Sequence, residues 1–140
     1  MDFSVFNKEI AILTARIFLG CLFFFQGYDA LFRVKMRSVV ETFEFPLANK
    51  GIPKFLLVLG AWFTSLSELT GGFLLMIGLF SSLASILLAA DLVFVAITFS
   101  IIRPMWDMQF VFPRLLLLLL IMFLPREWDI FSLDYLLNIK

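Results

Sequence analysis

Four charged side chains stand inside stretches of the chain that are otherwise apolar. They are Arg16, Glu68, Asp91 and Arg114. A charged residue within a membrane span costs about 2.5–3.5 kcal/mol on insertion scales, and it usually faces a partner or a wet cavity. Two cations and two anions can neutralise one another, surround a small polar molecule, or relay protons. These residues are the first candidates for chemistry.

The four charges are expected at a similar depth. Counted from the side where the second and third apolar stretches meet, Arg16 lies about six residues in, Asp91 about eight, Arg114 about ten and Glu68 about twelve. At 1.5 Å per helical residue, all four fall within roughly 10 Å of depth. Side chains on four different helices would therefore be able to meet at the centre of a bundle.

Small residues share a helix face with the first two of these charges. Gly20 and Gly27 fall on the stripe of the arginine in the first stretch, and Gly71 and Gly72 stand beside the glutamate in the second. Small residues let a neighbouring helix backbone approach closely inside a membrane. We expect these glycines to pack helices.

Two interpretations of the charges stay open. In the first, they form an ion-pair network that fixes helix order and register and has no substrate. In the second, they surround a polar pocket that binds a small molecule, such as a quinone head group, or relays protons. A third alternative is that helix order depends on partner subunits. The pKa values of the carboxyls would be shifted strongly in either of the first two interpretations, so a titration alone does not distinguish the ion-pair network from the binding pocket.

A second set of polar residues lies at the end of the first apolar stretch. Gln26, Tyr28 and Asp29 lie there, beside a basic loop. They are candidates to hydrogen-bond a carbonyl ligand. The plainer alternative is that they lie at the water interface.

Composition excludes several other functions. The chain has no His, which is the commonest metal ligand and the usual proton shuttle near neutral pH. Its single cysteine, Cys21, cannot form a C-x-x-C redox pair. We therefore predict no metal site. With 11 basic and 11 acidic residues the formal charge is zero, which argues against nucleic-acid binding.

The elements that must position these residues are membrane spans. Hydrophobic residues make up 62% of the chain, against roughly 45–50% in soluble domains. A transmembrane helix needs about 20 mostly apolar residues, and we predict spans at about 10–31, 55–80, 83–102 and 105–124. The second and third must form a hairpin, because only Ser81 and Ser82 separate them. The predicted fold is an all-α membrane protein with an antiparallel bundle of four transmembrane helices.

The prediction of the fourth span depends on the tryptophans that flank it. The uninterrupted apolar run at 115–124 is too short to cross alone. Trp106 and Trp128 lie about 33 Å apart along a helix, close to the roughly 30 Å hydrocarbon thickness, and Trp prefers the two interfaces. We therefore expect a helix kinked at Pro113, with Arg114 as a donor to the carbonyl that the proline leaves free.

The loop between the first two spans, about 32–54, is predicted to form a short interfacial helix. Val39, Val40 and Phe43 would give that helix one apolar face. A solvated linker is the alternative. Six Lys and Arg residues lie in the first and third loops, whereas three lie in the second loop and the termini. By the positive-inside rule this distribution favours an orientation with both termini outside.

Several short motifs resemble those of the DoxX family of small four-helix membrane proteins. They follow in the family's order: Arg16-x-x-x-Gly20, Gln26-Gly27, Gly51-Ile52-Pro53, Glu68-x-x-Gly71-Gly72 with Gly78-Leu79, and Ser132-Leu133-Asp134. The family more often has His-Gly where this chain has Gln26-Gly27. The resemblance covers nearly the whole chain.

The resemblance implies a multi-pass protein of the bacterial inner membrane. Some members resemble the membrane subunit of quinone-linked oxidoreductases such as thiosulfate:quinone oxidoreductase. We therefore expect a non-autonomous subunit of such a complex, with quinone as the expected cofactor and with other membrane proteins and the lipid bilayer as partners. The alternative is a non-catalytic scaffold or assembly factor.

Overall fold

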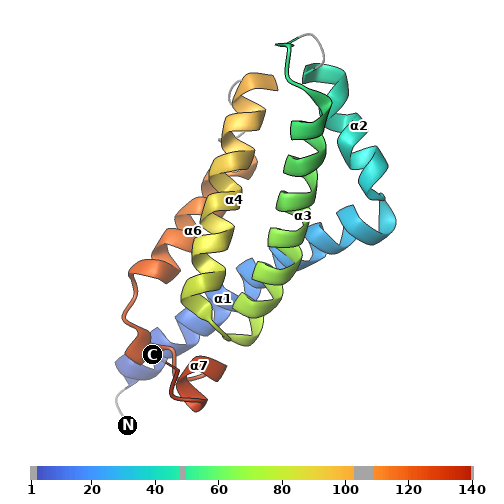
Figure 1. Cartoon of the computed structure of the whole chain (residues 1–140). Coiled ribbons are helices and arrows are strands. Elements are labelled where there is room, and N and C mark those ends of the chain that lie inside the picture. Colours follow the sequence, from blue (N-terminus) through green and yellow to red (C-terminus); the bar gives the residue numbers. More distant parts are fainter. Residues whose placement is uncertain (1–2, 48–49, 103–108, 140) are drawn as a thin grey trace.

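The computed structural model describes residues 3–47, 50–102 and 109–139 (Figure 1). Every regular element in these ranges is a helix, which confirms the expected all-α class. In chain order they are α1 (Phe3–Tyr28), the π-helical turn η1 (Asp29–Arg33), α2 (Met36–Leu47), α3 (Lys54–Ile77), α4 (Ser81–Ile102), α6 (Phe112–Phe123), the 3-10 turn η3 (Arg126–Trp128) and α7 (Leu133–Leu136).

In the described part of the chain, three helices are long and apolar enough to cross a membrane. They cover Asn7–Arg33, Lys54–Ile77 and Ser81–Ile102, in agreement with the first three predicted spans. The protein is therefore an integral membrane protein by the length and composition of its helices.

The fourth predicted span is described only in part. Helix α6 has 12 residues, about 18 Å at 1.5 Å per residue, which is short of the bilayer thickness. Pro113 stands in the first turn of α6, where its missing N–H needs no helical acceptor. Gln109 and Phe110 are also helical, and the turn at Val111 separates them from α6, so the helix is interrupted next to the proline. Residues 103–108, which include Trp106, lie outside the described residues.

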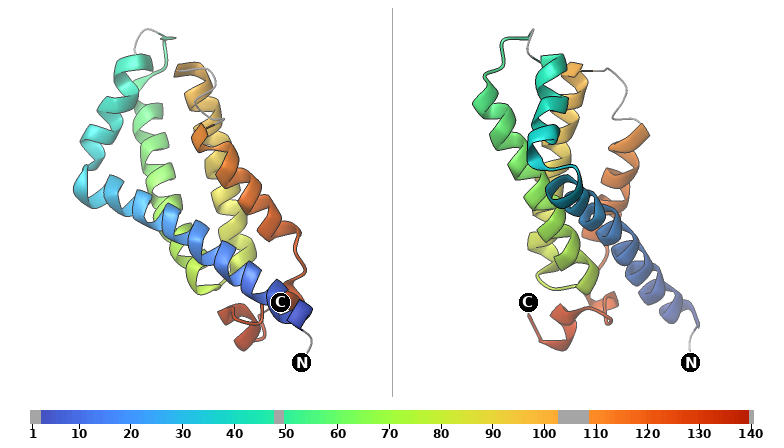
Figure 2. Two further views of the ribbon diagram at one scale, coloured as in Figure 1. Left: turned by 180° about the vertical axis from the view of Figure 1, so that it is seen from behind. Right: turned by 90° about the vertical axis from the view of Figure 1, so that its right-hand side faces the viewer.

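Helix α1 crosses α3 with the two backbones in direct contact. A Cβ atom at Gly20 would lie 2.8 Å from the backbone nitrogen of Met76, and one at Gly27 would lie 2.8 Å from the carbonyl oxygen of Ser65. Gly72 meets the backbone of α1 in the same way, beside Phe24. The two views of Figure 2 show α1 lying diagonally across the bundle. These glycines allow the close crossing.

Helices α3 and α4 form the expected hairpin. Gly78 ends α3 with a φ of 70°, a left-handed conformation that favours glycine. On the facing surfaces, Gly71 lies against the side chain of Leu88. The core joins α1, α3, α4 and α6 through Leu19, Phe23, Leu75, Ala84, Leu88, Leu92, Val111 and Leu118.

The loop after α1 contains a helix, as predicted. In α2, Val40 and Leu47 are buried and Val39 and Phe43 are half-buried. Helix α2 packs beside the first half of α3 (Figure 1). The apolar stripe thus faces the neighbouring helix.

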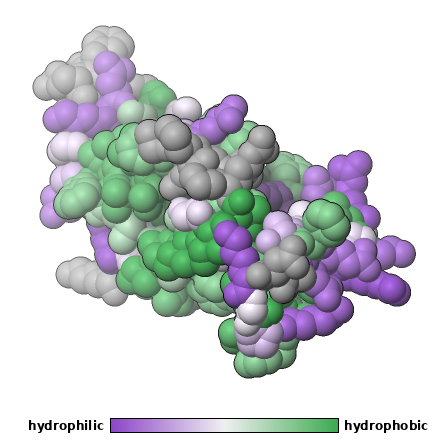
Figure 3. All heavy atoms as spheres, turned by 90° about the horizontal axis from the view of Figure 1, so that it is seen from above, coloured by the Kyte–Doolittle hydropathy of each residue, from purple (hydrophilic) through white to green (hydrophobic). Residues whose placement is uncertain are grey.

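The outer surface is largely apolar. Figure 3 shows hydrophobic residues across the middle of one face and hydrophilic residues toward its two sides. Large side chains stand out from the bundle, among them Phe18, Phe25 and Phe123, the last 84% exposed. Such a surface suits lipid.

Candidate functional site

One polar side chain from each of the four main helices meets inside the bundle. Gln26 of α1 donates through Nε2 to Glu68 Oε1 of α3 at 2.6 Å. Arg114 of α6 donates through Nη1 to Gln26 Oε1 at 2.5 Å. Asp91 of α4 interacts electrostatically with Glu68 and with Arg114. We call these four residues the polar cluster.

Asp91 is the incomplete member of the polar cluster. Its side chain is 0% exposed, and neither carboxylate oxygen has a hydrogen-bond partner among the described residues. Burying a polar group without a partner costs about 1–3 kcal/mol in protein mutational data. Both carboxylate oxygens of Asp91 could therefore accept a hydrogen bond from a further donor.

The polar cluster is buried on one side and open on the other. Glu68 is only 4% exposed, whereas Gln26 is exposed and Arg114 half-buried. The guanidinium of Arg114 also lies 5.8 Å from the ring centroid of Phe23. In the view from behind in Figure 2, α1 and α6 diverge from their neighbouring lower ends. A molecule in the membrane would reach the polar cluster from the side of α1 and α6.

Arg16 does not join the other three predicted charges. Its Nη1 forms an ion pair with Asp129 Oδ2 at 2.7 Å, and its Nη2 donates to the carbonyl oxygen of Phe131 at 3.0 Å. Because Arg16 precedes Gln26 by ten residues, it lies about 15 Å farther along α1. The tilted path of α1 places Gln26, and not Arg16, at the level of Glu68.

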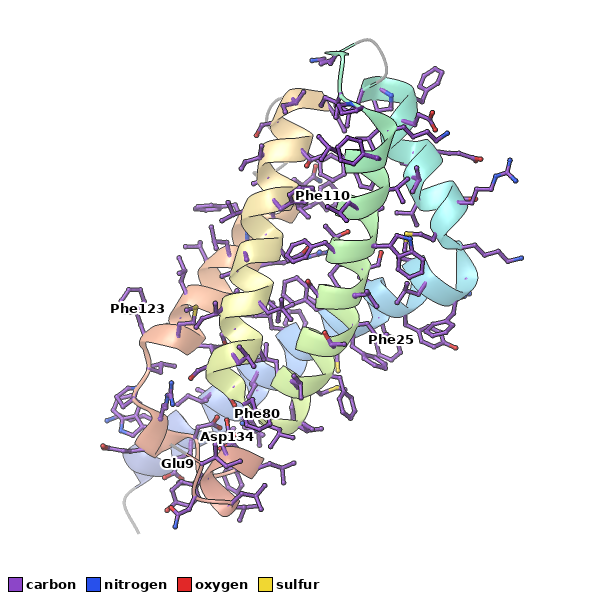
Figure 4. The ribbon with its side chains drawn as sticks, viewed as in Figure 1. Glu9, Phe25, Phe80, Phe110, Phe123 and Asp134 are labelled. Atoms are coloured by element: carbon purple, nitrogen blue, oxygen red, sulfur yellow. The ribbon has the colours of Figure 1, made fainter. Side chains whose placement is uncertain are left out.

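Arg16 instead anchors a C-terminal clamp, which we define as residues 126–139. Asp134 accepts hydrogen bonds from the backbone N–H groups of Phe80 and Ser81, both at 2.7 Å, at the start of α4. A carboxylate there complements the helix dipole and caps free N–H groups. Figure 4 shows Asp134 and Phe80 together at the lower end of the molecule.

Further contacts close the clamp around the hairpin. The N–H of Asp134 donates to the carbonyl oxygen of Gly78 at 2.9 Å. Ser132 donates its hydroxyl to the carbonyl oxygen of Asp129 at 2.7 Å. Burial raises the pKa of the Asp129 carboxyl, and the neighbouring Arg16 guanidinium opposes that rise. Ser132 and Asp134 of the Ser-Leu-Asp motif thus have a structural role.

Tyr28 and Asp29 lie apart from the polar cluster. Tyr28 stacks on Phe24, with ring centroids 6.4 Å apart. Asp29 pairs with Arg33 at 3.2 Å on the surface. Of the three polar residues at the end of the first span, Gln26 alone hydrogen-bonds to a member of the polar cluster in the contacts that the structure describes.

A second feature, which the sequence did not predict, is an apolar cavity between α2, α3 and α4. Its volume is about 660 Å³, within the range of small-molecule sites. The small residues Gly60 and Ala61 on α3, opposite the larger Phe94 and Val95 on α4, are the one sequence signal that hints at it.

Metal binding finds no support in the structure. Within the ranges 3–47, 50–102 and 109–139, no three His, Cys, Asp or Glu residues are placed to share an ion.

Comparison with known proteins identifies the family. The DoxX family model matches residues 11–101, which is more than half of the chain and includes Gln26, Glu68 and Asp91. No curated protein and no solved structure matches the chain. The family match agrees with the motifs around the α1–α3 crossing, and the chain belongs to the DoxX family.

Proposed function

We propose that this protein is the membrane subunit of a quinone-linked oxidoreductase complex, and that the polar cluster binds the quinone head group. The observation that carries the proposal is the buried carboxyl of Asp91, which has no hydrogen-bond partner among the described residues and lies near an Arg and a Gln that are at least partly exposed. A site that only fixed helix order would be expected to satisfy all its buried groups.

The side chains suit a carbonyl ligand. A quinone oxygen accepts hydrogen bonds, and the guanidinium of Arg114 has five N–H groups, of which the contact with Gln26 uses one. Glu68 and Asp91 are placed to hold and release protons beside that oxygen. Bound quinone would supply two-electron redox chemistry. Because Cys21 is the only cysteine, electrons would have to come from a partner subunit.

The proposed setting is the bacterial inner membrane. Helix α2 would lie at the membrane surface, with Val40 and Leu47 toward the bundle and its exposed charged residues toward water. Helix α6 is too short to cross alone, so a helix of a partner subunit would help to complete the fourth crossing. Association with other subunits fits that requirement.

The proposal is tested by the quinone that the protein retains. Protein purified in mild detergent should carry quinone, detected after solvent extraction. Glu68→Gln should reduce the retained quinone at least tenfold with little change in thermal unfolding. The amide keeps the shape of the side chain, but it cannot bind and release a proton as the carboxyl does. Glu44→Gln, which changes a surface carboxyl on α2, is the matched control. If Glu68→Gln lowers thermal stability and leaves bound quinone unchanged, the polar cluster is a structural network.

A scaffold role is the second candidate. It is favoured by the short α6 and by the exposure of Phe123 beside it, since a partner helix would cover both. Affinity capture from mild detergent separates the two roles: stoichiometric recovery of another membrane protein without quinone supports the scaffold.

A further inference from the structure

The apolar cavity lies apart from the polar cluster. Its wall includes Phe43 and Leu47 of α2, Leu57 and Ala61 of α3, and Val95 of α4. No member of the polar cluster lines it. A ligand in this cavity would therefore be a different molecule, or a different part of a molecule, from one held by Arg114.

The cavity wall is almost entirely apolar. Its hydroxyl side chains are Thr64 and Thr98, and the indole N–H of Trp62 is its other side-chain donor. Thr64 donates its hydroxyl to the carbonyl oxygen of Ala61 at 3.1 Å, and Thr98 donates to that of Phe94 at 2.9 Å. A polar head group would lose most of its hydrogen bonds to water there, which is unfavourable. The part of a ligand inside the cavity must be hydrocarbon.

A cation stands at the rim. Lys50 donates through Nζ to the carbonyl oxygen of Ile101 at 2.6 Å, and Ile101 lines the cavity. No carboxylate in the described part of the chain lies within ion-pair distance of Lys50, whereas the nearby Lys54 pairs with Glu44 at 2.9 Å. An ammonium group has three donors, so Lys50 has donors left for an anion.

We infer that the cavity holds one acyl chain of an anionic phospholipid and that Lys50 binds its phosphate. The apolar wall accounts for the acyl chain, and the Lys50 ammonium, which pairs with no carboxylate in the described part of the chain, accounts for the negative head group. At Ile52 and Ile101 the cavity wall reaches the same end of the bundle as the basic residues Lys50 and Lys54. Positively charged loops face the leaflet that is richer in anionic lipid. The inference uses no residue of the polar cluster, so it does not depend on the proposed function.

Trp62 provides the assay, because it lines the cavity. Replacing Trp106 and Trp128 with Phe leaves Trp62 as the only tryptophan. The protein is reconstituted into bilayers that contain either phosphatidylglycerol or phosphatidylcholine with brominated acyl chains, which quench nearby tryptophan. We expect brominated phosphatidylglycerol to occupy the site about fivefold more strongly than brominated phosphatidylcholine, the gain typical of one basic side chain near the surface.

Paired variants separate the two parts of the site. Lys50→Gln should abolish the preference for phosphatidylglycerol, whereas Lys35→Gln, an exposed lysine before α2, should preserve it. Thr98→Phe should fill the cavity and reduce quenching by both lipids, whereas Ile97→Phe, on the outer face of α4, should not. Equal quenching by the two lipids, or a preference that survives Lys50→Gln, would overturn the inference. So would displacement of the brominated lipid by a long-chain quinone and not by unbrominated phosphatidylglycerol.

Discussion

Gln26 joins Glu68 to Arg114 by using both ends of its amide. The nitrogen donates to the carboxylate at 2.6 Å and the oxygen accepts from the guanidinium at 2.5 Å. This amide orientation is the one that makes both contacts, since an Arg offers only donors and an ionised carboxylate only acceptors. The neutral side chain therefore links α1, α3 and α6 without adding charge.

Loss of that link should destabilise the protein. Gln26→Met has a similar length and removes both hydrogen bonds, which leaves the buried Glu68 without its partner. We expect a loss of about 1–3 kcal/mol, the cost of an unsatisfied buried group, measured as the shift in thermal unfolding in detergent. Asp29→Asn, which breaks only a surface ion pair, is the control and should change stability by less than about 1 kcal/mol. Equal effects of the two variants would contradict the role of Gln26.

Asp91 is expected to lower the stability of the protein and to be needed for quinone binding. Asp91→Leu replaces a buried carboxyl that has no hydrogen-bond partner among the described residues with an apolar side chain of similar size. We expect the free energy of unfolding of the variant to exceed that of the wild type by about 1–3 kcal/mol, seen as a higher unfolding temperature, and the variant to retain no quinone. Ser85→Ala, a change at another buried polar residue of α4, controls for the loss of a polar group. A variant that is destabilised and still carries quinone would show that Asp91 serves the fold.

The α1–α3 crossing should not tolerate a larger residue. Gly72→Leu places a side chain where the backbone of Phe24 lies, so one helix must move away. We predict a loss of at least about 1–3 kcal/mol, as for overpacked cores, and poor accumulation in the membrane. Thr70→Leu, an exposed position on the same helix, should accumulate normally. Normal accumulation of both variants would argue against the close crossing.

Protonation of Asp129 in the C-terminal clamp should raise the free energy of unfolding of the protein. The raised pKa of Asp129 in the folded protein means that the folded state binds a proton more readily than the unfolded state. Stability therefore falls as the pH rises from the unfolded pKa through the folded one. Asp129→Asn, which stays neutral, should gain stability over the wild type above this window, and the difference should shrink below it.

Thermal unfolding of the wild type and of Asp129→Asn across pH measures this difference. Arg16→Met should destabilise the clamp at neutral pH, because it removes the cation that opposes the buried charge. A wild type that loses stability relative to Asp129→Asn on acidification would mean that the ion pair, and not burial, dominates Asp129.

Hydropathy was sufficient to predict the three long helices, and the charge count singled out Glu68, Asp91 and Arg114, which the structure brings together. That these residues bind a ligand stays a prediction. Arg16 was misplaced because the depth estimate assumed upright helices, and the tilt of α1 depends on where Gly20, Gly27 and Gly72 let it cross α3. Crossing angles follow from packing between distant residues, which periodicity along one segment does not contain.

The C-terminal clamp and the cavity could not be predicted from the sequence either. Asp129 and Asp134 follow the last apolar run and look like ordinary solvated acids until their partners, Arg16 and the start of α4, are placed beside them. The cavity depends on the spacing of three helices. Pro113 was expected to kink the fourth span; the structure places it at the start of α6, next to the turn at Val111, and residues 103–108 of that span lie outside the described ranges.

Photoaffinity labelling with an azidoquinone tests the central claim most directly. After irradiation of the protein in bilayers, mass spectrometry of peptides should locate the label near Gln26 on α1 and near Arg114 on α6, and Glu68→Gln should reduce that labelling at least tenfold. Label spread over the lipid-facing surface, or concentrated at the cavity between α2, α3 and α4, would contradict a head-group site at the polar cluster.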